Sequence, residues 1–180
     1  GDFITLSEMV EKVRSDSIRF MMLYRKNEAP LEFDFQKVSE QSKDNPVFYV
    51  QYAHARISSV IRKIDEHKLK FNLSDFSKCK FYLLNSDHEL DLIKKILDWS
   101  SVIITSVNLY EPHRIAYYLY ELASSFHSLW NQGKIDSNLK FINDDDLDAT
   151  YARLSLIIAT QKTIKSGLDL LGVSAPDEMQ

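Results

Sequence analysis

The chain of 180 residues is 44% hydrophobic and 27% charged, which fits a globular protein of one or two domains and excludes a disordered chain. Its formal net charge of −4 argues against a protein that coats nucleic acid nonspecifically, although it does not exclude a local basic face. The single cysteine, Cys79, excludes an internal disulfide and a zinc site built mainly on cysteines. No apolar run is long enough for a membrane span and no signal-peptide pattern is present, so we expect a cytoplasmic protein.

The first quarter of the chain gives mixed signals. Thr5 and Glu8 have the spacing of a capping box and predict a short helix that ends near Arg14. Residues 16–24 fit either a helix or a buried strand, and residues 31–35 alternate over too short a stretch to predict a strand. Residues 36–43 predict a short polar helix that ends before Pro46.

A long amphipathic helix is predicted to begin at Asn45 and Pro46, where Asn suits a cap and Pro suits the first helical position. Its buried face is drawn by residues at alternating spacings of three and four: Val47, Val50, His54, Ile57, Ile61 and Ile64. The opposite stripe holds two aromatic rings and two cations: Tyr49, Tyr52, Arg56, Ser59 and Lys63. Aromatic rings can stack on unpaired bases and cations can attract phosphates, so this stripe could bind unstacked nucleotides. Alternatively, the helix is central in a bundle and its tyrosines pack against a neighbouring helix.

The rest of the chain also favours helices. Residues 65–85 predict a loop with a helical turn, and the capping box from Ser86 to Glu89 starts a helix or a bent pair of helices over 87–109. Pro112 is predicted at the first position of the next helix, which Gly133 would end. Its apolar face consists of Ile115, Leu119, Leu122, Phe126 and Leu129.

The last long helix is predicted to begin at the acidic residues 143–148, where the helix dipole favours negative charge. Its apolar stripe consists of Leu154, Ile158, Ile164, Leu168 and Leu171. We expect Gly172 to end it, and Gly167 inside it to mark the close approach of a neighbour. Four amphipathic helices with short connections predict an all-α, up-and-down bundle.

No catalytic arrangement is evident. No histidine or acid lies at a spacing from Cys79 that would indicate a catalytic base. We therefore keep the hypothesis of a thiol enzyme only as a control. His113 and His127 are too far apart to bind a metal as an i, i+4 pair, and the glycines form no phosphate loop. Trp130 ends a predicted helix and could be either a lid on the core or an exposed stacking surface. Met179 lies beyond the last apolar stripe.

Four segments, in order, resemble the C-terminal part of bacterial arginyl-tRNA synthetases. These are residues 16–22, 44–56, 111–123 and 165–179, and the most specific part is Gln-Tyr-Ala-His-Ala-Arg at 51–56. The resemblance covers essentially the whole chain. It implies a class I synthetase that joins arginine to its tRNA using ATP and magnesium, with a C-terminal helical domain that binds the anticodon loop. The family's catalytic motifs do not occur in this sequence, so the chain alone is expected to bind no cofactor and to be inactive.

The resemblance also implies which residues contact RNA. Tyr49, Tyr52 and Arg56 match positions on the anticodon side of the central helix, and Gln51 and His54 belong to the same motif, His54 as an orienting residue. Trp130 matches an aromatic position near the anticodon loop, and Met179 matches the family's terminal methionine. With two further cations to attract the backbone, the predicted RNA-binding set is Tyr49, Gln51, Tyr52, His54, Arg56, Arg62, Lys63, Trp130 and Met179.

Together these observations predict an anticodon-binding helical bundle of class I aminoacyl-tRNA synthetases over residues 45–180. Residues 1–44 would form a short helical junction segment to a catalytic domain of the same parent chain. We expect a monomer that binds arginine tRNA through its anticodon loop, with no membrane partner. The alternative is a helical protein-interaction module without RNA affinity, in which Tyr52→Ala and Trp130→Ala would leave RNA binding unchanged.

Overall fold

The computed structural model describes residues 13–26, 28, 40, 42, 44–66 and 79–179. These residues form helices and no strand, which confirms the all-α prediction. The elements are α2 (Ser15–Leu23), α4 (Pro46–Glu66), α5 (Asp87–Leu97), α6 (Trp99–Leu109), α7 (His113–Ile135) and α8 (Leu147–Leu171), with short 3₁₀ helices η1 (Phe81–Leu83) and η2 (Ser137–Leu139). The helices predicted over 5–14 and 36–43 and the alternating stretch 31–35 lie wholly or mostly outside the described residues.

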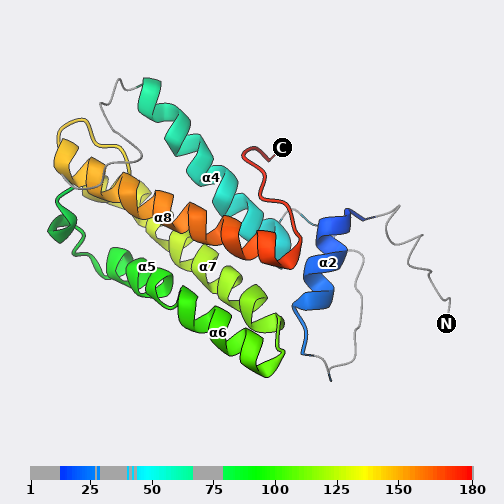
Figure 1. Ribbon diagram of the computed structural model, residues 1–180. Coiled ribbons are helices and arrows are strands. Elements are labelled where there is room, and N and C mark those ends of the chain that lie inside the picture. The colour runs from blue at the N-terminus through cyan, green and yellow to red at the C-terminus, as the bar shows by residue number, and fades with distance from the viewer. Residues whose placement is uncertain are drawn as a thin grey trace.

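The long helices run side by side in alternating directions, as expected for an up-and-down bundle (Figure 1). Helix α7 is central, because it contacts α4, α5, α6 and α8. Helix α2 packs against α4, α7 and α8 at one end of the bundle. After α8 the chain turns back and runs beside α4 toward the C-terminus (Figure 1). This return brings the last residues to the helix that carries most of the predicted site.

The core is formed by the apolar stripes that the sequence predicts. On α4, the predicted residues Val47, Val50 and Ile57 are fully buried, while Ile61 is only partly buried. The stripes of α7 and α8 are buried against them, so that each helix gains its stability mainly from the apolar area it removes from water. The stretch 16–24, which fits either a helix or a buried strand, begins in helix α2, and Phe20 of that helix is fully buried in the same core.

Most of the predicted helix ends are confirmed. Ser86 Oγ accepts from the Glu89 N–H at 3.3 Å, and Glu89 Oε2 accepts from the Ser86 N–H at 3.0 Å, which completes the capping box. Asp146 caps α8 by accepting from the Ala149 N–H at 3.0 Å. Gly172 ends α8 with a φ of 65°, a left-handed conformation that glycine adopts without strain.

Two glycines mark close contacts between elements. A Cβ atom on Gly167 would lie 2.6 Å from Leu119 Cδ2, which confirms the predicted close approach of a neighbour. The prediction that Gly133 ends α7 is wrong, because the helix continues to Ile135. A Cβ atom there would lie 2.9 Å from the carbonyl oxygen of Leu139, so Gly133 lets the η2 segment pack onto α7.

The start of α7 also differs from the prediction, because Pro112 lies at the cap position rather than at the first helical position.

A buried ion pair joins α5 to α8. Arg153 Nε donates to Glu89 Oε1 at 2.7 Å, and neither side chain is more than 7% exposed. Glu89 also accepts from the backbone and hydroxyl of Ser86, so its second oxygen is satisfied as well. The helix start at Ser86 and the pairing of the two helices therefore depend on one carboxylate.

Candidate nucleic-acid interface

Three separate parts of the chain meet at a surface hollow of about 460 Å³ that we call the Arg56 hollow. Helix α4 forms one wall, the end of α7 forms another, and the segment after α8 closes the third side. Its lining residues are Tyr52, Ala55, Arg56, Ser59, Arg62, Trp130, Lys134, Asp177, Glu178 and Met179. Five residues of the predicted RNA-binding set, Tyr52, Arg56, Arg62, Trp130 and Met179, are therefore brought together in space.

The guanidinium group of Arg56 lies against two aromatic rings. Its carbon is 4.2 Å from the ring centroid of Tyr52 and 4.9 Å from that of Trp130. Its Nη2 donates to the Tyr52 hydroxyl at 2.9 Å. Such cation–π contacts fix the plane of the guanidinium group while leaving donors at its edge. Trp130 is in turn held by ring contacts with Phe126 and Phe141, and it is half-buried rather than a closed lid or a free platform.

His127 of α7 lies behind Arg56 and fixes it from the other side. Its Nε2 lies 3.2 Å from the carbonyl oxygen of Tyr49, and its Nδ1 lies 3.3 Å from Arg56 Nη1. A carbonyl can only accept and a guanidinium can only donate, so Nε2 carries the proton and Nδ1 accepts. Burial, together with the positive charge of Arg56, lowers the pKa of His127 from 6.5 to about 4, although the bond to the carbonyl of Tyr49 opposes the shift. The neutral imidazole thus orients Arg56.

Polar residues on the inner side of α4 hold the segment after α8. Gln51 Nε2 donates to the carbonyl oxygen of Ser174 at 2.9 Å and to Asp16 Oδ2 at 3.1 Å. His54 Nδ1 lies 2.9 Å from the carbonyl oxygen of Pro176 and therefore donates to it. Both side chains are buried, at 8% and 3% exposed. Their hydrogen bonds hold the segment after α8 against α4, and this segment places Met179 at the hollow.

The same segment brings two acids to the rim of the Arg56 hollow. Asp177 Oδ1 accepts from Ser58 Oγ at 2.8 Å, and the carbonyl oxygen of Asp177 accepts from Arg62 at 3.3 Å. Glu178 Oε1 lies 3.6 Å from Arg62 Nη1, in a pair whose side chains are 77% and 49% exposed. Exposed pairs of this kind contribute about 0–1 kcal/mol, so an incoming phosphate can compete for Arg62.

The remaining predicted residues lie beside the hollow. Tyr49 is half-buried, with its ring 4.5 Å from that of His127 and 5.2 Å from that of Tyr120. Lys63 is exposed one turn beyond Ser59. Sequence reasoning missed the roles of His127, Ser58 and Asp177, because nothing in their spacing relates them to Arg56 or to α4.

The other candidate chemistry finds little support in the described residues. Cys79 Sγ lies 3.2 Å from Ser155 Oγ and 3.9 Å from the carbonyl oxygen of Tyr151, neither of which is a base. Within the part of the chain described, no group of three or more His, Cys, Asp or Glu residues is placed to hold a metal ion. None of the described helices is long and apolar enough to cross a membrane.

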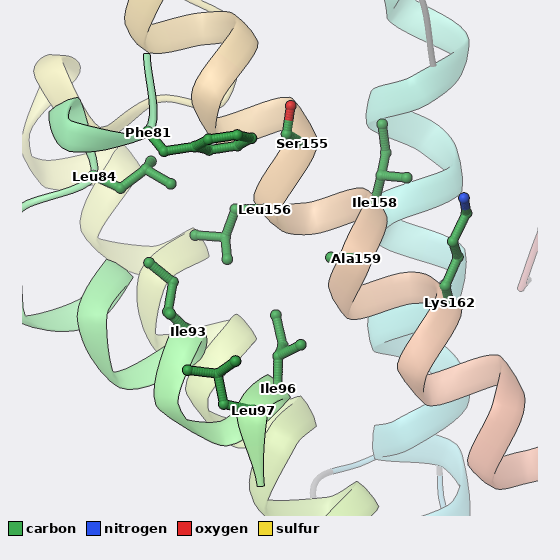
Figure 2. Close-up of a pocket in the computed structure, with 10 residues that line it drawn as sticks. All are labelled: Phe81, Leu84, Ile93, Ile96, Leu97, Ser155, Leu156, Ile158, Ala159 and Lys162. Atoms are coloured by element: carbon green, nitrogen blue, oxygen red, sulfur yellow. The ribbon is translucent and has the colours of Figure 1, made fainter. Parts of the chain in front are cut away.

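A second cleft, of about 400 Å³, differs in character (Figure 2). It lies between η1, α5 and α8, and its walls are almost entirely apolar, with Lys162 as the one cation among its described lining residues. Its other lining residues are Phe81, Leu84, Ile93, Ile96, Leu97, Ser155, Leu156, Ile158 and Ala159. Because phosphate groups require several donors or cations, this cleft is a poor surface for RNA.

Comparisons with known proteins place the chain in a family. The DALR anticodon-binding domain family matches residues 50–179. An arginine–tRNA ligase of Rhizobium etli is 51% identical over 181 residues, which cover the whole of this chain and 31% of that protein. A Campylobacter jejuni protein assigned as an arginyl-tRNA synthetase superimposes with a TM-score of 0.83 at 28% identity, over 99% of this chain and 36% of the other. Thermus thermophilus arginyl-tRNA synthetase superimposes with a TM-score of 0.68 at 26% identity, over 99% of this chain and 28% of the other.

These matches confirm the resemblance that the four sequence segments predict. The chain spans about a third of the length of the curated relatives it matches, since it covers 31% of them. The matched range runs from α4 through Met179 and so includes all three parts of the chain that meet at the Arg56 hollow. This chain therefore belongs to the DALR anticodon-binding domain family.

Proposed function

We propose that this chain is the part of an arginyl-tRNA synthetase that binds the anticodon loop, and that RNA binds at the Arg56 hollow. The observation that carries the proposal is the convergence of Tyr52, Arg56, Trp130 and Met179 from three separate parts of the chain. Single-stranded RNA loops are recognised by aromatic stacking combined with cationic donors, and this hollow offers both within one surface.

In this mechanism, bases splayed out of the loop stack against the exposed parts of Tyr52 and Trp130, and Met179 supplies an adaptable apolar contact. Arg56 uses two of its N–H groups on Tyr52 and His127. A guanidinium group has about five N–H donors, so the others can reach base edges or phosphate oxygens. Because the two rings and His127 hold Arg56 in place, little side-chain freedom is lost when RNA binds.

The other predicted residues act around this centre. Arg62 and Lys63 attract the RNA backbone, and Arg62 exchanges its exposed contact with Glu178 for a phosphate. Tyr49 supports His127 from behind. Gln51 and His54 act indirectly, because they hold the segment that places Met179 in the hollow. His54 is thus an orienting residue.

The whole protein would join arginine to its tRNA using ATP and magnesium in a catalytic domain carried by the rest of the parent chain. On this proposal the 180 residues alone are inactive and bind no cofactor. Residues 1–44 would form the junction to the catalytic domain and residues 45–180 the binding domain. We also propose that the protein acts as a monomer in the cytoplasm.

Replacing Tyr52 with alanine tests the proposal. We expect the affinity of the chain for arginine tRNA to fall by about 1–3 kcal/mol, because a stacking surface and one anchor of Arg56 are lost together. That loss corresponds to a dissociation constant raised by about 5- to 150-fold. The measurement is filter binding or fluorescence anisotropy at fixed salt, with circular dichroism to show that the variant is folded.

The matched control is Tyr82→Ala, since Tyr82 is 74% exposed on η1 and lies outside the residues lining the Arg56 hollow. It should bind arginine tRNA as the unmodified chain does. The rival hypothesis, a protein-interaction module without RNA affinity, predicts that neither substitution alters binding. Equal affinities for a folded Tyr52→Ala variant and the unmodified chain would overturn the stacking role.

A further inference from the structure

Another hollow, of about 270 Å³, adjoins the Arg56 hollow and combines apolar walls with three lysines. We call it the lysine hollow. It is lined by Val60, Lys63, Trp130, Gly133, Lys134, Leu139, Lys140, Phe141 and Ile142. Trp130 and Lys134 line both hollows, so the two are neighbours on one surface.

The charged residues that the structure describes around the lysine hollow are all cations. Lys63 comes from α4, Lys134 from the last turn of α7 and Lys140 from the residues after η2, and all three are exposed. Among the described residues that line this hollow none is acidic, whereas Asp177 and Glu178 line its neighbour. Among the residues that the structure describes, none of the three lysines pairs with a carboxylate. Three exposed cations around one depression favour an anionic ligand.

The lysine hollow is built by specific packing. Gly133 allows the backbone of Leu139 to approach α7, because a Cβ atom would lie 2.9 Å from the Leu139 carbonyl oxygen. Phe141 is buried and its ring is stacked on that of Phe126 at 5.9 Å. The carbonyl oxygen of Lys140 accepts from the buried Arg153 at 3.4 Å. The backbone that carries Lys140 is thus fixed opposite Lys63 and Lys134.

We propose that the lysine hollow binds backbone phosphates of the RNA whose bases occupy the neighbouring Arg56 hollow. This inference rests on the proposed function and extends it to Lys134 and Lys140, two residues that the sequence did not single out. Lysine acts on phosphate as a point charge and reads no base, so the lysine hollow positions the RNA while the Arg56 hollow contacts the bases. Because the net charge of −4 opposes the approach of RNA, a local basic surface would favour binding.

The salt dependence of binding tests the inference. The variant carries Lys63→Gln, Lys134→Gln and Lys140→Gln together, and its affinity for arginine tRNA is measured over a series of salt concentrations. Each phosphate contact contributes about 0.7 to the slope of log K against log salt for a single strand. We therefore expect the slope to become shallower by about 2 for three contacts.

A matched control removes the same charge elsewhere, through Lys94→Gln, Lys162→Gln and Lys165→Gln on α5 and α8. It should leave the slope unchanged, which separates a local contact from the general effect of net charge. If both triple variants alter the slope equally, or neither alters it, the lysine hollow makes no specific phosphate contact and the inference is overturned.

The outcomes also separate this inference from the proposed function. If Tyr52→Ala weakens binding but the lysine variant keeps the original slope, RNA binds at the Arg56 hollow alone and the inference fails. If the triple variant of Lys63, Lys134 and Lys140 shows a shallower salt dependence while Tyr52→Ala binds normally, the phosphate contact stands and the stacking proposal fails. If the unmodified chain binds no tRNA at low salt, both are overturned.

Discussion

Replacement of Glu89 by alanine is expected to lower the free energy of unfolding by about 3–5 kcal/mol, because Arg153 is left as a buried charge without its partner. Glu89 is fully buried, and Arg153 donates to it at 2.7 Å. The substitution also removes the acceptor for the Ser86 N–H at the start of α5. Urea unfolding followed by circular dichroism measures the loss.

Two further variants test the reason for this loss. Glu121→Ala breaks the pair with Lys95, whose side chains are 59% and 33% exposed, and should cost only about 0–1 kcal/mol. Replacing Glu89 and Arg153 together by methionine removes both charges at similar volume, and such replacements are commonly neutral or stabilising. The double variant should therefore be more stable than Glu89→Ala. A Glu89→Ala variant no less stable than Glu121→Ala would contradict the buried-pair account.

Acidification from pH 6.5 to pH 4 is expected to remove about 3 kcal/mol of stability through His127 alone. The pKa of His127 is lowered on folding, so the unfolded chain binds the proton more readily in this range and folding stability falls as the pH falls. The contribution is fully present above pH 6.5 and flattens below about pH 4. Its physical cause is the burial of the imidazole, with the Arg56 guanidinium as a second, smaller cause.

The variant His127→Gln isolates this effect. A glutamine amide offers one acceptor for Arg56 and one donor for the Tyr49 carbonyl, and it does not titrate. The difference in unfolding free energy between the two proteins should be constant above pH 7. Below that, the unmodified chain should lose stability faster, by at most about 1.4 kcal/mol per pH unit. Parallel curves from pH 7 to pH 4 would contradict a buried, neutral His127.

Local signals were enough to predict most of the bundle. The capping box at Ser86, the acidic start of α8 and the glycine at 172 each have a mechanism confined to a few residues, and all three are observed. Apolar spacing identified the buried faces of α4 and α7, since the helical period itself determines which residues face the core. The ambiguity at 16–24 was not resolved by local spacing, and the structure shows a helix that packs on α4, α7 and α8.

Contacts between residues far apart in the chain could not be predicted from the sequence. Gly133 was expected to end α7, but its role is to admit the backbone of Leu139, a contact formed only after the chain turns back. His54 was expected on the buried face, and it is buried, yet its bond to the carbonyl of Pro176 depends on the path of the C-terminal segment.

The candidate site was predicted in part. Spacing on one helix placed Tyr52 and Arg56 on the same face, and the family resemblance added Trp130 and Met179. The structure shows these four residues lining one hollow. The support of Arg56 by His127 could not be predicted, because the two lie on different helices and are 71 positions apart in the sequence. Lys134 and Lys140 line the same hollow because the chain turns after α7.

The most direct test of the proposed function is the affinity of this chain for three RNAs across a salt series: arginine tRNA, the same tRNA with an altered anticodon, and an unrelated tRNA. We predict that arginine tRNA binds most tightly at every salt concentration and that altering its anticodon removes the preference. Equal affinity for all three, lost together as salt rises, would show that the chain attracts only phosphates and would contradict anticodon recognition at the Arg56 hollow.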